Sequence, residues 1–215
     1  MSDEKSLWII GLCGRSGSGK SFVSHLFGLE GVPSVDTDAV YREMTKACED
    51  GEMSECMKEL VAEFGCDIVN EDGSLNRPAL ANIVFAAGAG EKLAKLNEIT
   101  HKHILSETDR RISLYGEEGR RAVIIDAPLL FESGYDKKCD FIVAASAPEE
   151  LLVKRITARD GLDRDGALRR LKVQIKDEEL RSRADFVIET DADEEELKLR
   201  IKDILDQMSV QLKGD

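Results

Sequence analysis

Short apolar runs alternate along the chain with longer segments in which apolar residues recur every three or four positions. The apolar runs span residues 8–12, 122–125 and 141–145, and a last strand is predicted over residues 184–188, where Asp185 interrupts the apolar residues. The segments with helical periodicity include residues 20–29, 53–64, 93–115 and 193–208. Continuous apolar runs of this length indicate strands buried on both faces, and strands that alternate with helices are typical of βαβ units. The pattern therefore predicts an α/β fold with a parallel sheet flanked by helices.

The first predicted strand and the first predicted helix are joined by a G-x-x-x-x-G-K-S pattern, a Walker A or phosphate-binding loop. Its residues are Gly14, Arg15, Ser16, Gly17, Ser18, Gly19, Lys20 and Ser21. Glycines let the backbone fold closely around an anion, and the amides converge on it at the positive end of the helix. We predict a nucleoside triphosphate site in which Lys20 reaches the β- and γ-phosphates and Ser21 holds Mg²⁺. The alternative is a glycine-rich turn without a ligand, which the flanking strand and helix disfavour.

A second, shorter strand is predicted over Ser34–Ala39. Asp36 and Asp38 are two residues apart, so on an extended backbone both side chains would project to one face. Ligands of α/β sheets bind at the carboxyl ends of the strands, where Asp38 would lie opposite the phosphate loop and accept a hydroxyl proton. A second interpretation stays open, because Asp38 precedes a helical segment and would also suit a turn or an N-cap.

Two further features suggest phosphate chemistry. Asp126 follows the apolar run at residues 122–125 and could bind Mg²⁺ through water. Arginines are then concentrated in one span, at positions 155, 159, 164, 169, 170, 181 and 183. Guanidinium groups suit phosphate oxygens, and a helical lid that donates one or two of them would exclude water from ATP. Arginines interleaved with acids are also typical of solvated helix faces.

Composition narrows the class of protein. The 215 residues are 42% hydrophobic and 34% charged, which fits one large domain with insertions. The net charge of −13 argues against nucleic-acid binding, which needs a basic face. No apolar run approaches the length of a membrane span, and the polar residues 1–6 do not resemble a signal peptide. We therefore expect a cytoplasmic protein with no membrane partner.

Cysteine, histidine and phenylalanine positions carry weaker signals. The cysteines at positions 13, 48, 56, 66 and 139 form no C-x-x-C pair, so neither a disulfide framework nor a zinc site is indicated. Cys13 is expected to be a small buried residue and not a nucleophile. By spacing alone, His101 and His103 on the predicted long helix are surface or core groups. An apolar stripe ending in Phe85 predicts core positions on a helix that Arg77 and Pro78 open.

Several separated stretches resemble the dephospho-coenzyme A kinase family. They are Gly11–Ser21, Val35–Ala39, Phe64–Gly65, Asp72–Arg77, Ile83–Phe85, Leu96–His101, Pro128–Gly134, Arg159–Gly161, Gln174 and Ala184–Ile188. Many families share the phosphate loop, whereas the D-x-D-A, L-N-x-I-T-H and P-L-L-F-E patterns in this order are far more specific. The chain departs from the family pattern at Arg15-Ser16, where Gly and a small apolar residue are usual, and at Glu189-Thr190, where Asp or Asn followed by Asn is expected near the adenine.

The resemblance implies a transferase of three-layer P-loop kinase fold that completes coenzyme A biosynthesis. Such an enzyme moves the γ-phosphate of ATP, with Mg²⁺, to the ribose 3′-hydroxyl of dephospho-coenzyme A and releases coenzyme A and ADP. It further implies a single domain over residues 1–215 with three parts. These are a core over about 7–39, 120–150 and 184–215, a helical acceptor-binding insertion over about 40–119, and a helical lid over about 151–183.

The resemblance also implies roles for individual residues. Asp38 maps onto the candidate base, and the lid arginines map onto Arg155 and Arg159, with Arg155 expected to stabilise the developing charge. The residues that would face the acceptor are Asp36, Asp38, Arg77, Phe85, His101 and Glu132. We expect a monomer or a weak homo-oligomer. Two alternatives stay open: another P-loop kinase acting on a nucleoside or nucleotide, or a P-loop switch protein, although the guanine motif N-K-x-D of a GTPase is absent from the sequence.

Overall fold

The computed structural model describes residues 7–47 and 51–211 and divides the chain into two compact units. Residues 1–35 and 112–215 form the first, which we call the sheet unit, and residues 36–111 form the second, the helical unit. The helical unit is one continuous stretch of chain, close to the insertion predicted over residues 40–119. Which substrate each part binds remains a prediction.

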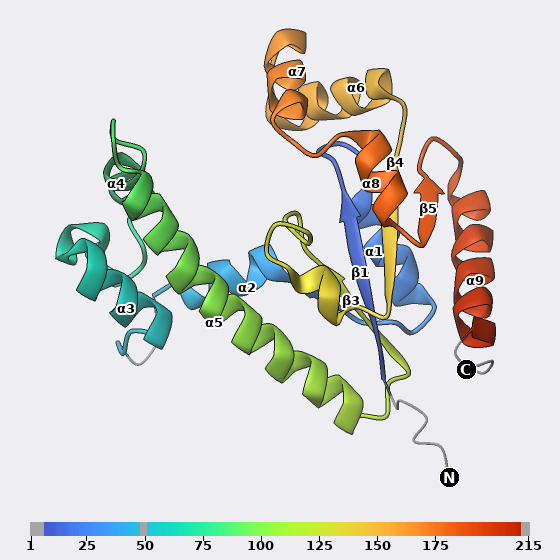
Figure 1. Ribbon diagram of the computed structural model, residues 1–215, viewed down its shortest axis with the longest axis horizontal. Helices are drawn as coiled ribbons and strands as arrows, with labels where there is room; N and C mark the ends of the chain where they lie inside the picture. The colour runs from blue at the N-terminus through green and yellow to red at the C-terminus, as the bar shows by residue number, and fades with distance from the viewer. Residues whose placement is uncertain (1–6, 48–50, 212–215) are drawn as a thin grey trace. The chain divides into compact units, whose positions relative to one another are not determined.

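The sheet unit contains a five-stranded sheet in the order β2-β3-β1-β4-β5, with β1 between β3 and β4 (Figure 1). The strands are β1 (Trp8–Gly14), β2 (Ser34–Asp36), β3 (Ala122–Asp126), β4 (Phe141–Ser146) and β5 (Phe186–Glu189). Strand β1 runs parallel to β3 and to β4, and β4 runs parallel to β5. All five residues of β3 are buried, as expected for a strand covered on both faces. The predicted α/β fold with a parallel sheet is confirmed.

The sheet unit also contains helices, of which some pack on the sheet. They are α1 (Lys20–Leu29), α6 (Glu149–Asp160), α7 (Arg164–Lys172), α8 (Asp177–Arg183) and α9 (Glu194–Gln211). Helices α1 and α9 contact each other and bury Phe27 and Ile201 in the same apolar core as Ile10 and Val143 of the sheet. Helices α6 and α7 form a separate cluster around Ile156.

The helical unit has a core of its own. Its helices are α2 (Thr37–Met44), α3 (Glu55–Phe64), α4 (Arg77–Val84) and the part of α5 (Gly90–Glu117) up to residue 111. Met57, Leu60, Ile68, Leu80 and Ile99 meet in one buried cluster that draws on three of these helices and on the short 3₁₀ turn Cys66–Ile68. The helical periodicity predicted over residues 53–64 and 93–115 is confirmed, and Pro78 does lie in the first turn of α4.

Two local predictions were wrong. The strand predicted over Ser34–Ala39 ends at Asp36, and α2 begins at Thr37. The Asp36 carboxylate accepts hydrogen bonds from the backbone N–H groups of Asp38 (2.8 Å) and Ala39 (3.0 Å), so it is Asp36 that caps the helix. The two aspartates therefore do not project from one face of a strand.

Phe85 was expected in the apolar stripe of α4, and its side chain is not part of the core. Helix α4 ends at Val84, and Phe85 occupies the C-cap position with 71% of its surface exposed. Because the helix stops one residue earlier than the stripe, Phe85 no longer shares the buried face of Leu80 and Val84.

Within residues 7–47 and 51–211, no helix combines the length and the apolar character needed to cross a bilayer.

Candidate active site

The loop between β1 and α1 has the backbone geometry of a phosphate-binding loop. Gly17 and Gly19 have φ angles of 79° and 82°, in the left-handed region that side chains with a Cβ rarely adopt. A Cβ on Gly17 would also lie 2.7 Å from the carbonyl oxygen of Leu152. Both glycines are thus required by conformation, and the predicted strand, loop and helix around the motif are confirmed.

Helix α1 presents its N-terminus directly after this loop, with Gly19 as the N-cap. The first N–H groups of a helix have no acceptor within the helix, and together with the helix dipole they favour an anion. Lys20 and Ser21 lie in this first turn. The geometry therefore suits the binding of a phosphate group, with an ammonium and a hydroxyl beside it.

Lys20 forms an ion pair with the carboxylate of Asp126. Strand β3 places Asp126 in register with Leu12 of β1, and only 16% of the Lys20 side chain and 8% of the Asp126 side chain are exposed. A buried ammonium and carboxylate depend on each other, because either charge alone would be costly to bury. The Ser21 hydroxyl and the Asp126 carboxylate are hard oxygen donors, so they fit Mg²⁺, which is usually held by one or two protein groups, phosphates and water.

Two residues from other parts of the chain, Thr190 and Arg155, donate hydrogen bonds to carbonyl groups of the phosphate loop. The Thr190 hydroxyl donates to the carbonyl of Ser18 (2.6 Å). The guanidinium of Arg155 donates to the carbonyl of Gly17 (3.1 Å) and to the hydroxyl and carbonyl oxygens of Thr190 (2.9 and 2.7 Å). Sequence reasoning singled out Arg155 but not its partners, and it missed this role of Thr190.

The two loop residues that depart from the family pattern contact the end of α7 and the segment that follows it. The Arg15 guanidinium donates to the carbonyl of Leu171 (3.1 Å). Ser16 donates its backbone N–H to the side-chain carbonyl of Gln174 (3.0 Å), and the Gln174 amide donates back to the Ser16 hydroxyl (2.9 Å). Side chains of the loop are thus tied to residues of the span 151–183, which is predicted to be a lid. In the same span, the Arg159 side chain is 60% exposed and forms a bidentate pair with Asp160.

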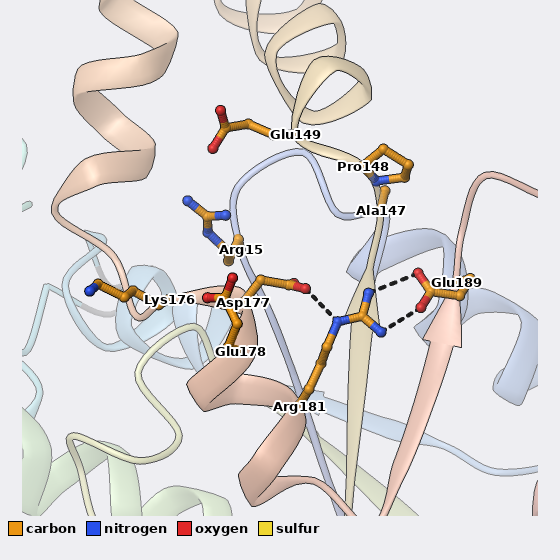
Figure 2. Close-up of a pocket in the computed structure, with 9 residues that line it drawn as sticks. All are labelled: Arg15, Ala147, Pro148, Glu149, Lys176, Asp177, Glu178, Arg181 and Glu189. Atoms are coloured by element: carbon orange, nitrogen blue, oxygen red, sulfur yellow. Dashed lines mark hydrogen bonds and ion pairs between the residues drawn. The ribbon is translucent and has the colours of Figure 1, made fainter.

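A pocket of about 390 Å³ adjoins the loop through Arg15. Its other lining residues are Ala147, Pro148, Glu149, Lys176, Asp177, Glu178, Arg181 and Glu189. In Figure 2, Arg181 bridges Asp177 of α8 and Glu189 of β5, and it also donates to the Ser146 hydroxyl (2.7 Å). Burial alone would raise the pKa of Asp177, but the hydrogen bonds from Arg181 and Ser146 outweigh it and lower the pKa.

We expect Arg181→Met to destabilise the protein by about 1–3 kcal/mol at pH 7, because Asp177 and Glu189 lose their shared partner. The lowered pKa of Asp177 means that its contribution to stability is present above its unfolded pKa, about 3.9, and is lost as the pH falls through the folded value. Urea unfolding should therefore give different free energies of unfolding for wild type and variant at pH 7. The two free energies should converge as the pH falls below about 4.

Arg164→Met is a matched control for that comparison, since Arg164 pairs with Glu150 on the exposed surface. It should change stability by less than about 0.5 kcal/mol. If Arg181→Met were equally mild at pH 7, the Asp177–Arg181–Glu189 cluster would have no stabilising role.

Residues expected to face the acceptor lie on several elements. In the helical unit, Asp38 is exposed in the first turn of α2, and the Arg77 guanidinium lies over the ring of Tyr41, 5.4 Å from its centroid. Phe85 is exposed after α4, and His101 is half-buried on α5. In the sheet unit, Glu132 is exposed in the segment that follows β3.

Cys13 lies at the end of β1, one residue before the phosphate loop. It is buried, its Sγ contacts the carbonyl of Val143 (3.6 Å), and burial raises the pKa of its thiol to about 12. A thiol in this state is not a nucleophile near neutral pH. The prediction that Cys13 is a small buried residue is confirmed. Cys48 lies outside the described residues.

These features together define a P-loop kinase. The sheet is parallel, a glycine loop leads into α1, Lys20 is largely buried, and an arginine-rich helical segment follows β4. A family model described as dephospho-CoA kinase matches residues 8–196. The chain belongs to the dephospho-CoA kinase family. The dephospho-CoA kinase of Corynebacterium efficiens is 38% identical over 204 residues, which cover 95% of this chain and 98% of that one.

Solved structures agree on the fold. The chain resembles TT1252 from Thermus thermophilus with a TM-score of 0.75 and 34% identity, covering 93% of this chain and 97% of that one. The dephospho-CoA kinase from Campylobacter jejuni has a TM-score of 0.66 over 95% of this chain and 98% of that one, and at 22% identity this likeness concerns the fold alone.

Proposed function

We propose that this chain transfers the γ-phosphate of ATP to the ribose 3′-hydroxyl of dephospho-coenzyme A, giving coenzyme A and ADP. The observation that carries the proposal is a phosphate loop with the required glycine geometry in a chain that matches the dephospho-CoA kinase family over residues 8–196. A different small-molecule P-loop kinase and a P-loop switch protein would share the loop, but the family match does not favour either.

The phosphate end of ATP is proposed to bind at the loop Gly14–Ser21. Its amides and the N-terminus of α1 would neutralise the phosphate oxygens, and Lys20 would turn from Asp126 toward the β- and γ-phosphates. Ser21, with Asp126 acting through water, would hold Mg²⁺, which when bound supplies further neutralisation of phosphate charge. The chain's own contribution is positioning and electrostatic stabilisation.

Asp38 is proposed to orient the acceptor hydroxyl and to accept its proton as the oxygen attacks the γ-phosphorus and the bond to the β–γ bridging oxygen breaks. Its carboxylate is exposed, and it is Asp36, not Asp38, whose carboxylate caps α2. The cap supports the role of Asp38 by fixing the backbone on which it stands. Asp36, Arg77, Phe85, His101 and Glu132 remain proposed contacts of the acceptor.

Residues 151–183 are proposed to form a helical lid that excludes water from ATP. Arg155 donates to the loop itself, whereas Arg159 is largely exposed and pairs only with its neighbour Asp160 among the contacts described. These contacts favour Arg159 as the arginine that reaches the developing charge, with Arg155 in a supporting position. A cytoplasmic location and a monomeric or weakly oligomeric state also remain predictions.

The test is ADP release from ATP and Mg²⁺ measured with and without dephospho-coenzyme A. We expect the acceptor to stimulate ADP release at least about tenfold, and the 3′-phosphorylated product to form in equal amount, because closure around the acceptor excludes water. Nucleosides and nucleotides serve as competing acceptors. Turnover that is independent of dephospho-coenzyme A, or greater with another acceptor, would contradict the proposal.

A further inference from the structure

Thr190 connects the end of β5 to the phosphate loop, although 172 residues separate it from Ser18. It is only 3% exposed, and its hydroxyl is used twice, as a donor to the Ser18 carbonyl (2.6 Å) and as an acceptor from Arg155 (2.9 Å). The contact with the loop is close, since a Cβ on Gly19 would lie 3.2 Å from the Thr190 hydroxyl oxygen.

We propose that Thr190 is a positioning residue that aims the amides of the phosphate loop at the bound triphosphate. In a trans peptide the C=O and the next N–H point in opposite directions. The Ser18 carbonyl, drawn outward by the Thr190 hydroxyl, therefore turns the Gly19 N–H to the opposite side. The inference rests on the proposed function only in taking ATP as the ligand.

Arg155 holds the preceding peptide of the loop. Its guanidinium donates to the Gly17 carbonyl, and the N–H of the same peptide, that of Ser18, donates to the Arg15 carbonyl (3.0 Å) within the loop. Two further bonds to Thr190 hold the guanidinium in place, so Thr190 acts on the Ser18 carbonyl directly and on the Gly17 carbonyl through Arg155. Because Gly17 and Gly19 leave the backbone many conformations, anchors of this kind help to fix the direction of the Gly19 N–H.

Thr190→Val is the decisive substitution, because valine has nearly the same shape and lacks the hydroxyl. ATP affinity is measured by titration calorimetry without acceptor, and KM and kcat by coupled ADP release. We expect the valine variant to bind ATP about tenfold more weakly or worse, because a buried site loses the hydrogen bonds of the Thr190 hydroxyl. The KM for dephospho-coenzyme A should stay within about twofold of wild type, because its site is not supported by Thr190.

Thr190→Ser and Val210→Thr are the controls. Serine restores the hydroxyl and should restore ATP affinity to within about threefold, while Val210→Thr makes the reverse exchange at an exposed residue of α9 and should leave ATP affinity unchanged. Thr190→Val should weaken ATP binding less in the Arg155→Met variant than in the wild type, because the two residues share partners.

Three outcomes with the variants would contradict the inference. A valine variant that binds ATP like wild type, even if its melting temperature falls, would leave Thr190 a packing residue. A serine variant as weak as the valine variant would mean that the hydroxyl alone does not position the loop, and strictly additive effects of Thr190→Val and Arg155→Met would mean that the two residues act independently. A wild type that binds ATP without acceptor-dependent turnover would contradict the proposed function alone, and one that does not bind ATP would contradict both.

Discussion

Lys20→Met is expected to lower acceptor-dependent kcat by about a hundredfold to a thousandfold, the cost of removing one buried group that stabilises transition-state charge. Methionine keeps the length and most of the volume of lysine but carries no charge. The same change leaves Asp126 without the partner seen in the structure, so the melting temperature should also fall.

The double variant Lys20→Met/Asp126→Asn separates these two effects. Removing the second charge should recover much of the lost stability, measured by thermal unfolding, without recovering turnover. Lys198→Met on α9 serves as a matched control, because Lys198 pairs with Glu194 and Glu195 at the surface. Recovery of turnover in the double variant would mean that Lys20 acts only by neutralising Asp126.

Asp38→Asn is expected to reduce kcat with dephospho-coenzyme A by about a hundredfold or more, the usual contribution of a general base. Asparagine has the same shape and can still hold the acceptor hydroxyl by a hydrogen bond, but it cannot take its proton. The KM for ATP should stay within about twofold, since Asp38 is proposed to act on the acceptor hydroxyl and not on the nucleotide. The measurement is ADP release at saturating ATP across a range of acceptor concentrations.

Asp206→Asn provides the matched comparison for Asp38→Asn, because Asp206 is an exposed carboxylate on α9 with no proposed role. It should leave both kinetic constants unchanged. Asp38→Asn turning over as fast as Asp206→Asn would remove Asp38 from the mechanism and require another base for the acceptor hydroxyl.

The sheet and the phosphate loop could be predicted because their signals are local. Buried strands appear as apolar runs, and the turn into α1 depends on glycines at fixed offsets within Gly14–Ser21. Asp36 and Asp38 show the limit of this reasoning. Either aspartate could cap α2, and a shift of two residues in the start of the helix decides which side chain meets the free N–H groups.

The supports of the loop could not be predicted from one sequence. Thr190 and Gln174 meet the loop across 172 and 158 residues, and no periodicity or spacing links such distant positions. Arg155 stood out as one of many arginines, but its residue type does not reveal whether its guanidinium turns toward the loop or toward solvent. Phe85 was assigned to the core because the apolar stripe continued past Val84, where the helix itself ends.

The helical unit is an uninterrupted stretch, residues 36–111, whose core is filled by its own side chains. The chain enters it once and leaves it once, while every element of the phosphate loop and its supports lies outside it. In evolutionary terms, such a stretch can change in length and composition without altering the residues that form the phosphate loop. If the helical unit binds the acceptor, as predicted, a lineage could acquire a new acceptor by replacing one contiguous segment of its gene.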